Sequence, residues 1–231
     1  MDVTLPGPGT TPDAPRREVL CGDGRAFLES ASLGPNDAIV TSLPDVSEIA
    51  GATAESWRAW FLDTVALACR ASHDESVILF YQTDVKRDGR LIDKGYLVQR
   101  AAEDAGLSCL FHKIVCRVAP GETTFGRPAF AHLLAFSRDA RLQVSQSLPD
   151  VLPSLGKMTW SRAMGLEACL LTGKFLLRST QTRRVVDPFC GLGTMLAVAN
   201  ALGLDALGVE LSKKRARRAR NLTLDIGAGL A

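Results

Sequence analysis

One stretch near the end of the chain constrains the fold more than any other. A short apolar run ends at Asp187, a turn containing Gly191 and Gly193 follows, and a run of small residues starts at Thr194. This is the pattern of a strand, a glycine-rich loop and a helix. Glycines allow the backbone to approach a ligand closely, and a helix N-terminus offers unpaired N–H groups and a positive dipole end. We therefore expect a ligand site at this loop.

A second acidic residue follows the next apolar run, which covers residues 206–209 and ends at Glu210. A carboxylate at the end of a second parallel strand can accept two hydrogen bonds from a ribose diol. A nicotinamide dinucleotide site would also need Gly or Ala at the third position of its Gly-x-Gly-x-x-Gly fingerprint, where this chain has Leu196. The pattern therefore disfavours that cofactor.

The rest of the chain alternates between apolar strand patterns and amphipathic helix patterns. We expect strands over 18–21, 37–41, 76–81, 107–118 and 129–136, and helices over 24–31, 56–72 (with Ser56 as N-cap), 91–105 and 159–179. No helix separates 107–118 from 129–136, so these two strands are expected to pair antiparallel at an edge. The alternation predicts an α/β fold: a Rossmann-like, seven-stranded, mostly parallel sheet with helices on both faces.

Ligands of such sheets bind at the carboxyl ends of the strands. Four predicted strands end at Asp23, at the segment 42–45, at Asp187 and at Glu210. Each of these predictions comes from a separate stretch, and together they indicate one common site.

Composition and cysteine spacing indicate the domain organisation and the cellular compartment. We expect a flexible tail over residues 1–16 and one domain over 17–231. The six cysteines have neither Cys-x-x-Cys spacing nor a histidine at ligand spacing, so we interpret them as reduced thiols of an intracellular, cytoplasmic protein without a metal site. No apolar run is long enough for a membrane span. The net charge of +2 argues neither for nor against nucleic acid.

The stretch Asp-Pro-Phe-Cys-Gly-Leu-Gly-Thr (187–194), followed by Gly-Val-Glu (208–210), resembles the first two motifs of class I S-adenosylmethionine (SAM) methyltransferases. The variant is typical of enzymes that methylate amino groups in nucleic acids. The resemblance implies SAM as the cofactor. It implies that the following residues contact SAM: Asp23, Ser161, Asp187, Phe189, Gly191, Gly193, Thr194, Glu210 and Leu211.

The order of the motifs resembles that of the circularly permuted DNA amino-methyltransferases. Such chains open with a Gly-Asp strand, here ending at Asp23, and reach the acceptor motif about 20 residues later. They then carry an edge strand like 129–138 and a Lys-containing helix like 157–177, before the glycine-rich loop. The resemblance covers nearly all of residues 18–222 and implies a circularly permuted sheet.

The acceptor motif departs from the family pattern. Ser42 and Pro44 match it, whereas Leu43 and Asp45 replace a proline and an aromatic residue. The resemblance implies that the Ser42 side chain and the Leu43 carbonyl accept hydrogen bonds from the target amine. Asp45 cannot stack on a flipped base. The alternative roles for it are to accept a proton from the nucleophile, to recognise a cationic or amine substrate, or to cap the following turn. We include residues 42–45 as the catalytic candidates.

The sequence does not identify the methyl acceptor. Residues 139–156 are too few for a base-reading domain, so we expect RNA before DNA, with a protein partner as a possible source of recognition. The alternatives are methylation of a protein or small molecule, and a non-catalytic SAM-binding assembly protein.

Three further features have two interpretations each. The basic run 213–220 is either a phosphate contact or a solvated helix with Leu211 and Ala219 facing the sheet. Trp57 and Trp60 either stack on a base or belong to the core. The three histidines are interpreted as structural.

Overall fold

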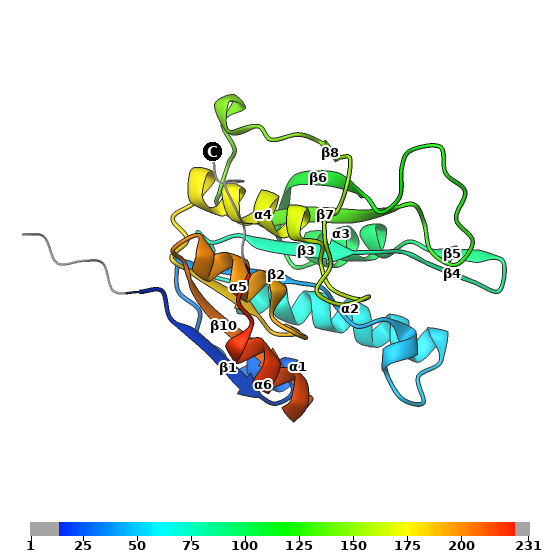
Figure 1. Cartoon of the computed structure of the whole chain (residues 1–231), viewed down its shortest axis with the longest axis horizontal. Helices are drawn as coiled ribbons and strands as arrows, with labels where there is room; N and C mark the ends of the chain where they lie inside the picture. Colours follow the sequence, from blue (N-terminus) through cyan, green and yellow to red (C-terminus); the bar gives the residue numbers. More distant parts are fainter. Residues whose placement is uncertain (1–13, 225–231) are drawn as a thin grey trace, which may run out of the picture.

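The computed structural model describes residues 14–224 and shows an eight-stranded mixed sheet. Across the sheet the strands lie in the order β1 (Arg17–Cys21), β10 (Asp205–Glu210), β9 (Arg184–Asp187), β2 (Asp37–Thr41), β3 (Ile78–Gln82), β7 (Phe130–Ser137), β6 (Ser108–Cys116) and β8 (Val151–Leu152). A separate hairpin, β4 (Val85–Arg87) with β5 (Arg90–Ile92), projects from the body of the molecule (Figure 1). The helices are α1 (Gly24–Ser30), α2 (Ala54–Ala71), α3 (Lys94–Asp104), α4 (Leu166–Ser179), α5 (Thr194–Ala201) and α6 (Lys213–Asn221), with short 3-10 turns η1 (Val46–Glu48) and η2 (Val144–Gln146).

Strands from the two ends of the chain lie side by side. Figure 1 shows β1 beside β10. The two strands pair in parallel, with Cys21 opposite Glu210, and β9 lies between β10 and β2. The ion pair between Arg184 Nε and Asp37 Oδ1, at 2.7 Å, joins the starts of β9 and β2. The loops that follow these four parallel strands therefore leave the sheet at the same edge.

Two hydrophobic layers hold the helices on opposite faces of the sheet. Helices α1, α2 and α3 contribute to one layer, in which Phe61 of α2 and Leu97 of α3 are almost fully buried. Helices α4, α5 and α6 contribute to the other, with Phe175 of α4 and Leu196 of α5. This is the three-layer arrangement that the alternation of strands and helices predicts.

The strand predictions were confirmed with three differences. The sheet has an eighth strand, because Val151 and Leu152 pair in parallel with β6 inside the stretch expected to be a linker. The antiparallel strand β7 lies between β3 and β6, third from the edge. The polar stretch 82–90, expected to be a loop, contributes Gln82 to β3 and most of the hairpin β4–β5.

Three helix starts were predicted wrongly. Thr53, not Ser56, is the N-cap of α2, and the two side chains form a reciprocal capping box. Helix α3 begins after Asp93 and α4 after Gly165, later than the expected residues 91 and 159. A Cβ atom at Gly165 would lie 1.9 Å from the carbonyl oxygen of Leu155, so tight backbone packing holds residues 159–165 outside the helix.

Residues 1–13 of the expected tail and residues 225–231 of the expected domain lie outside the described part of the chain. Arg16, also assigned to the tail, donates its N–H to Asp205 Oδ1 at 2.7 Å. All six cysteines are unpaired, and four of them are buried. Within residues 14–224, no helix has the length and apolar character needed to cross a membrane.

Candidate active site

A cavity of about 530 Å³ lies at the carboxyl ends of β1, β10, β9 and β2. We call it the main cavity. Residues 22–24 and 42–44 line it from the first part of the chain, and residues 187–191 and 209–211 line it from the last part. Its volume lies within the range of small-molecule and cofactor sites. The two ends of the polypeptide therefore meet at one site of a size suited to a cofactor.

The two glycines of the glycine-rich loop have different tasks. Both adopt left-handed backbone conformations, with φ of 56° at Gly191 and 79° at Gly193. Gly191 lines the main cavity opposite Trp160. Gly193 does not line it; a Cβ atom there would lie 2.9 Å from the Cβ of Ala219, so this glycine allows α6 to pack against the start of α5.

Glu210 is held by the residues that follow it. Its Oε1 accepts hydrogen bonds from Ser212 N at 2.7 Å and from Arg215 Nε at 2.8 Å. The guanidinium of Arg215 in turn lies over the ring of Trp160, with 5.9 Å between Cζ and the ring centroid. All of these contacts with described residues use Oε1, so Oε2 stays available for the hydroxyl groups of a ligand.

The loop after β1 is fixed against the glycine-rich loop. Asp23 is the N-cap of α1, and its Oδ1 accepts hydrogen bonds from Arg25 N and Ala26 N. A Cβ atom at Gly24 would lie only 2.1 Å from the carbonyl oxygen of Pro188. Only a glycine allows this approach, which brings Asp23 to the main cavity.

Asp187 is a buried carboxyl group between two loops. Its Oδ1 accepts from Thr41 Oγ1 at 2.8 Å and from the backbone N–H of Phe189 at 3.1 Å. Burial raises the pKa of Asp187 to about 7, and the nearby Glu210 carboxylate acts in the same direction, whereas the two hydrogen bonds oppose the increase. Asp187 therefore ties the end of β2 to the glycine-rich loop.

The loop after β2 forms the opposite wall of the main cavity, through Ser42, Leu43 and Pro44. Among the described residues, no partner hydrogen-bonds to the Ser42 hydroxyl. The Pro44 carbonyl accepts a hydrogen bond from the indole N–H of Trp57 at 3.1 Å, which anchors the loop to α2. We call residues 42–45 the acceptor loop.

Asp45 turns away from the main cavity and lines a neighbouring cavity of about 40 Å³, which we call the small cavity. Its Oδ1 accepts from Val46 N in a capping box at the start of η1, and its Oδ2 pairs with Arg127 at 2.9 Å. The capping role considered from the sequence is thus present in the structure. Ser161 lines the same small cavity, from the irregular segment before α4.

The structure brings together most of the predicted site residues. The following line the main cavity: Asp23, Ser42, Leu43, Pro44, Asp187, Phe189, Gly191, Thr194, Glu210 and Leu211. Gly193, Asp45 and Ser161 do not. Sequence reasoning missed Arg162, which pairs with Glu48 at 2.8 Å between the two cavities, because nothing in the sequence links residues so far apart.

Comparisons with known proteins identify the fold. Protein-family models and curated protein sequences gave no match to the chain. Among solved structures, the PvuII DNA methyltransferase (cytosine-N4-specific) aligns with a TM-score of 0.71 at 14% identity, over 92% of this chain and 88% of the other. TTHA0409 of Thermus thermophilus, described as a DNA modification methylase and complexed with SAM, aligns with a TM-score of 0.65 at 22% identity, over 88% and 91%. The M1.HpyAVI–SAM complex gives a TM-score of 0.61 at 14% identity, over 88% and 98%.

The chain has a methyltransferase fold. At these sequence identities the alignments establish the architecture alone, because one fold can support different functions. The chemistry depends on the residues that line the two cavities.

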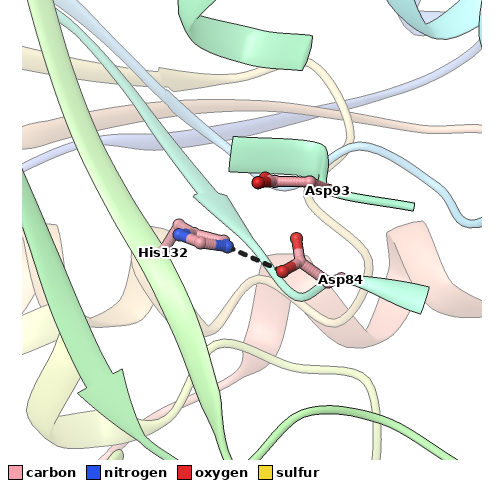
Figure 2. A group of neighbouring side chains, drawn as sticks. All are labelled: Asp84, Asp93 and His132. Atoms are coloured by element: carbon pink, nitrogen blue, oxygen red, sulfur yellow. Dashed lines mark hydrogen bonds and ion pairs between the residues drawn. The ribbon is translucent and has the colours of Figure 1, made fainter. Parts of the chain in front are cut away.

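A second cluster of polar side chains lies within this methyltransferase fold, near the start of α3. Figure 2 shows the side chains of Asp84, Asp93 and His132 pointing toward one another. One carboxylate oxygen of each aspartate and one ring nitrogen of His132 all lie within 4.8 Å of one another. His132 Nε2 lies 3.0 Å from Asp84 Oδ2, and its Nδ1 lies 2.8 Å from His112 Nε2. Asp84 Oδ1 accepts from Lys94 N and Asp93 Oδ1 from Tyr96 N, so both carboxylates also hold the N-terminus of α3.

The whole basic run, residues 213–220, lies on α6, and its lysines and most of its arginines are exposed. Ala216 and Ala219 face the sheet, whereas Leu211 is 71% exposed, so the expectation that Leu211 would face the sheet was wrong. Of the two tryptophans, Trp57 is fully buried in the core, and Trp60 lines the main cavity with its ring edge-on to Phe189.

Proposed function

We propose that this chain is a SAM-dependent methyltransferase that methylates an amino group in nucleic acid. The observation that carries the proposal is the main cavity itself. Its lining combines the glycine-rich loop and Glu210 from the end of the chain with Asp23 and the acceptor loop from the beginning. We also propose that the sheet is circularly permuted, since the strand that precedes the glycine-rich loop, β9, is the middle one of the five parallel strands β1, β10, β9, β2 and β3 but comes late in the sequence.

The residues of the main cavity fit SAM. Glu210 Oε2 would accept from the ribose hydroxyls, and Asp23, which lines the same cavity, would accept from the adenine amine. The backbone at Gly191 and the N-terminus of α5 provide N–H groups for the carboxylate of the methionine portion. Phe189 and Met195 add apolar lining. When bound, SAM would supply a methyl group on a positively charged sulfur, which needs little acid–base assistance.

The acceptor loop would then position the nucleophile. The hydroxyl of Ser42, to which no described residue hydrogen-bonds, and the carbonyl of Leu43 would accept hydrogen bonds from the target amine and hold its nitrogen toward the methyl group. The hydrogen bond from Trp57 to the Pro44 carbonyl keeps this loop in place. In this proposal catalysis comes mainly from positioning in a partly enclosed cavity.

Two observations support a nucleic-acid substrate. The structural neighbours include DNA methyltransferases, one of them specific for the N4 amino group of cytosine. Trp60 lines the main cavity beside Phe189 and can stack on a base, the task for which Asp45 is unsuited. The neighbours favour DNA, whereas the short segment 139–156 favours RNA or recognition through a partner protein.

The test is transfer of labelled methyl groups from SAM to DNA, RNA and protein prepared from cells that lack this chain. The proposal expects label in DNA or RNA, on an exocyclic amine after digestion to nucleosides, and loss of label with Ser42→Ala. Label only in protein would contradict the nucleic-acid substrate. SAM binding with no transfer to any fraction would indicate a non-catalytic SAM-binding protein and contradict the enzymatic proposal.

A further inference from the structure

The small cavity lies beside the acceptor loop and shares part of its lining with the main cavity. Ser42, Leu43 and Ala163 line both cavities, as do the ion-paired residues Glu48 and Arg162. A group in the small cavity would therefore lie next to an acceptor amine at Ser42. Its volume of about 40 Å³ has room for a compact polar group and none for a base.

The lining of the small cavity carries an excess of positive charge. Four cationic side chains contribute to it: Lys94, Arg117, Arg127 and Arg162. Two carboxylates face them, and each already has a partner: Asp45 is paired with Arg127, and Glu48 with Arg162. Arg117 donates to the neutral carbonyl of Pro128 at 3.1 Å. Two positive charges thus stay without a carboxylate of their own among the described residues.

Lys94 is the least solvated of these cations. It is 3% exposed, and it makes no ion pair with a described residue. Burial lowers the pKa of its ammonium group, whereas the Asp45 carboxylate opposes the decrease and Arg127 adds to it. A buried cation without its own counter-ion is costly, and an anion in the cavity would stabilise it.

The backbone of Lys94, at the start of α3, is held in place by Asp84 and His132. Asp84 accepts from its backbone N–H at 2.8 Å, and His132 contacts the other oxygen of Asp84. A Cβ atom at Gly95 would lie 2.8 Å from the His132 ring, so the first turn of α3 has little freedom to shift. The cluster in Figure 2 therefore holds Lys94 at the cavity.

Hydroxyl groups complete a set of donors around the small cavity. Tyr81 and Thr83 line it together with Lys94 and Arg117. Burial raises the pKa of Tyr81 to about 12, so its hydroxyl stays neutral and can donate. Donors from several directions suit a tetrahedral oxyanion, because an ammonium group and a guanidinium fork can each bind different oxygens.

We propose that the small cavity binds a phosphate group of the methyl acceptor, with Lys94 and Arg117 as its principal contacts. The inference rests on the proposed function and deepens it: the acceptor is a nucleotide whose phosphate is bound beside the amine that is methylated. The contact fixes the position of the target nucleotide without reading its base.

The test compares cytidine with cytidine 5′-monophosphate by calorimetry on the full chain saturated with S-adenosylhomocysteine. The wild type is expected to bind the monophosphate about tenfold more tightly than the nucleoside. Lys94→Met and Arg117→Met should each bring this ratio close to one, and Arg117→Lys should restore part of it. Lys86→Met removes an exposed lysine of β4 outside both cavities and should keep the wild-type ratio. Thermal unfolding and affinity for S-adenosylhomocysteine would establish that each variant is folded.

Equal affinity for the two probes in the wild type, or a ratio that survives both Met variants, would overturn the inference. If S-adenosylhomocysteine does not bind, the proposed function fails, and the small cavity is tested separately with inorganic phosphate. Phosphate should then raise the unfolding temperature of the wild type and of Lys86→Met, but not of Lys94→Met, and no difference would overturn the inference. Two modified oligonucleotides would distinguish an internal from a terminal phosphate. Weaker binding with one neutral methylphosphonate linkage would indicate an internal phosphate, and weaker binding without the 5′-phosphate would indicate a terminal one.

Discussion

Thr41 donates a hydrogen bond to Asp187 at 2.8 Å, although 146 residues separate them in the sequence. Thr41 ends β2 immediately before the acceptor loop, and Asp187 ends β9 immediately before the glycine-rich loop. The same oxygen of Asp187 also accepts from Phe189 N. One buried carboxyl group therefore fixes the two sides of the main cavity relative to each other.

The raised pKa of Asp187 predicts a specific dependence of stability on pH. In the unfolded chain this carboxyl group loses its proton near pH 4, and in the folded chain at about 7. Between these values the folded state holds a proton that the unfolded state has released, so the free energy of unfolding decreases as pH rises and levels off above pH 7. For a pKa increase of this size, the contribution is roughly 4 kcal/mol.

Asp187→Asn is neutral at every pH and can still accept from Thr41, so it should not show this decrease. Urea unfolding at pH 4.5 and pH 8 would measure the free energy of unfolding of both proteins. The free energy of unfolding of the variant relative to the wild type should increase from pH 4.5 to pH 8. Asp104→Asn changes an exposed carboxylate of α3 and should follow the wild type. A wild-type pH dependence in Asp187→Asn would show that the group has an ordinary pKa.

Gly24→Ala should destabilise the protein. The added methyl group would lie 2.1 Å from the Pro188 carbonyl oxygen and 3.0 Å from the Phe189 ring, so the backbone must shift at a cost of about 1–3 kcal/mol. Gly22→Ala is the matched control, because a Cβ atom there has no neighbour within 4 Å and should change stability by less than about 0.5 kcal/mol. Equal unfolding temperatures for the two variants would refute the close approach.

Ser42 and Asp45 should respond differently to truncation. Ser42→Ala removes a hydroxyl group that no described residue uses, so stability and SAM affinity should hold while methyl transfer falls about ten- to hundredfold. Asp45→Ala removes the cap of η1 and the partner of Arg127, and should cost about 1–2 kcal/mol of stability. Asp45→Asn keeps an acceptor for Val46 N and should cost less. A rate of methyl transfer by Ser42→Ala equal to that of the wild type would show that the Ser42 hydroxyl has no part in the reaction.

Local sequence signals predicted the elements that form the main cavity. The strand before Asp187, the turn at Gly191 and the strand ending at Glu210 are short-range patterns, and each lies where it was expected. Ser56 was mistaken for a cap because Thr53 also has a cap-forming side chain, and the reciprocal hydrogen bonds decide between them only in the folded helix.

The features that the sequence did not predict depend on contacts between residues far apart in the chain. The start of α4 depends on the approach of Gly165 to Leu155, and the edge strand β8 depends on pairing with β6. Asp45 could be placed only once Arg127, 82 residues away, was found beside it. The small cavity needed the same information, because its cations come from α3, from the connection between β6 and β7, and from the segment before α4.

The most direct measurement is a calorimetric titration of the full chain with SAM, repeated with Asp23→Ser and Glu210→Gln. Asp23→Ser keeps an N-cap residue for α1, and Glu210→Gln keeps the size of the side chain. If the beginning and the end of the chain build one cofactor site, one SAM should bind per chain, and each substitution should weaken binding about tenfold. The absence of binding heat in the wild type, or an affinity that neither substitution changes, would contradict this conclusion.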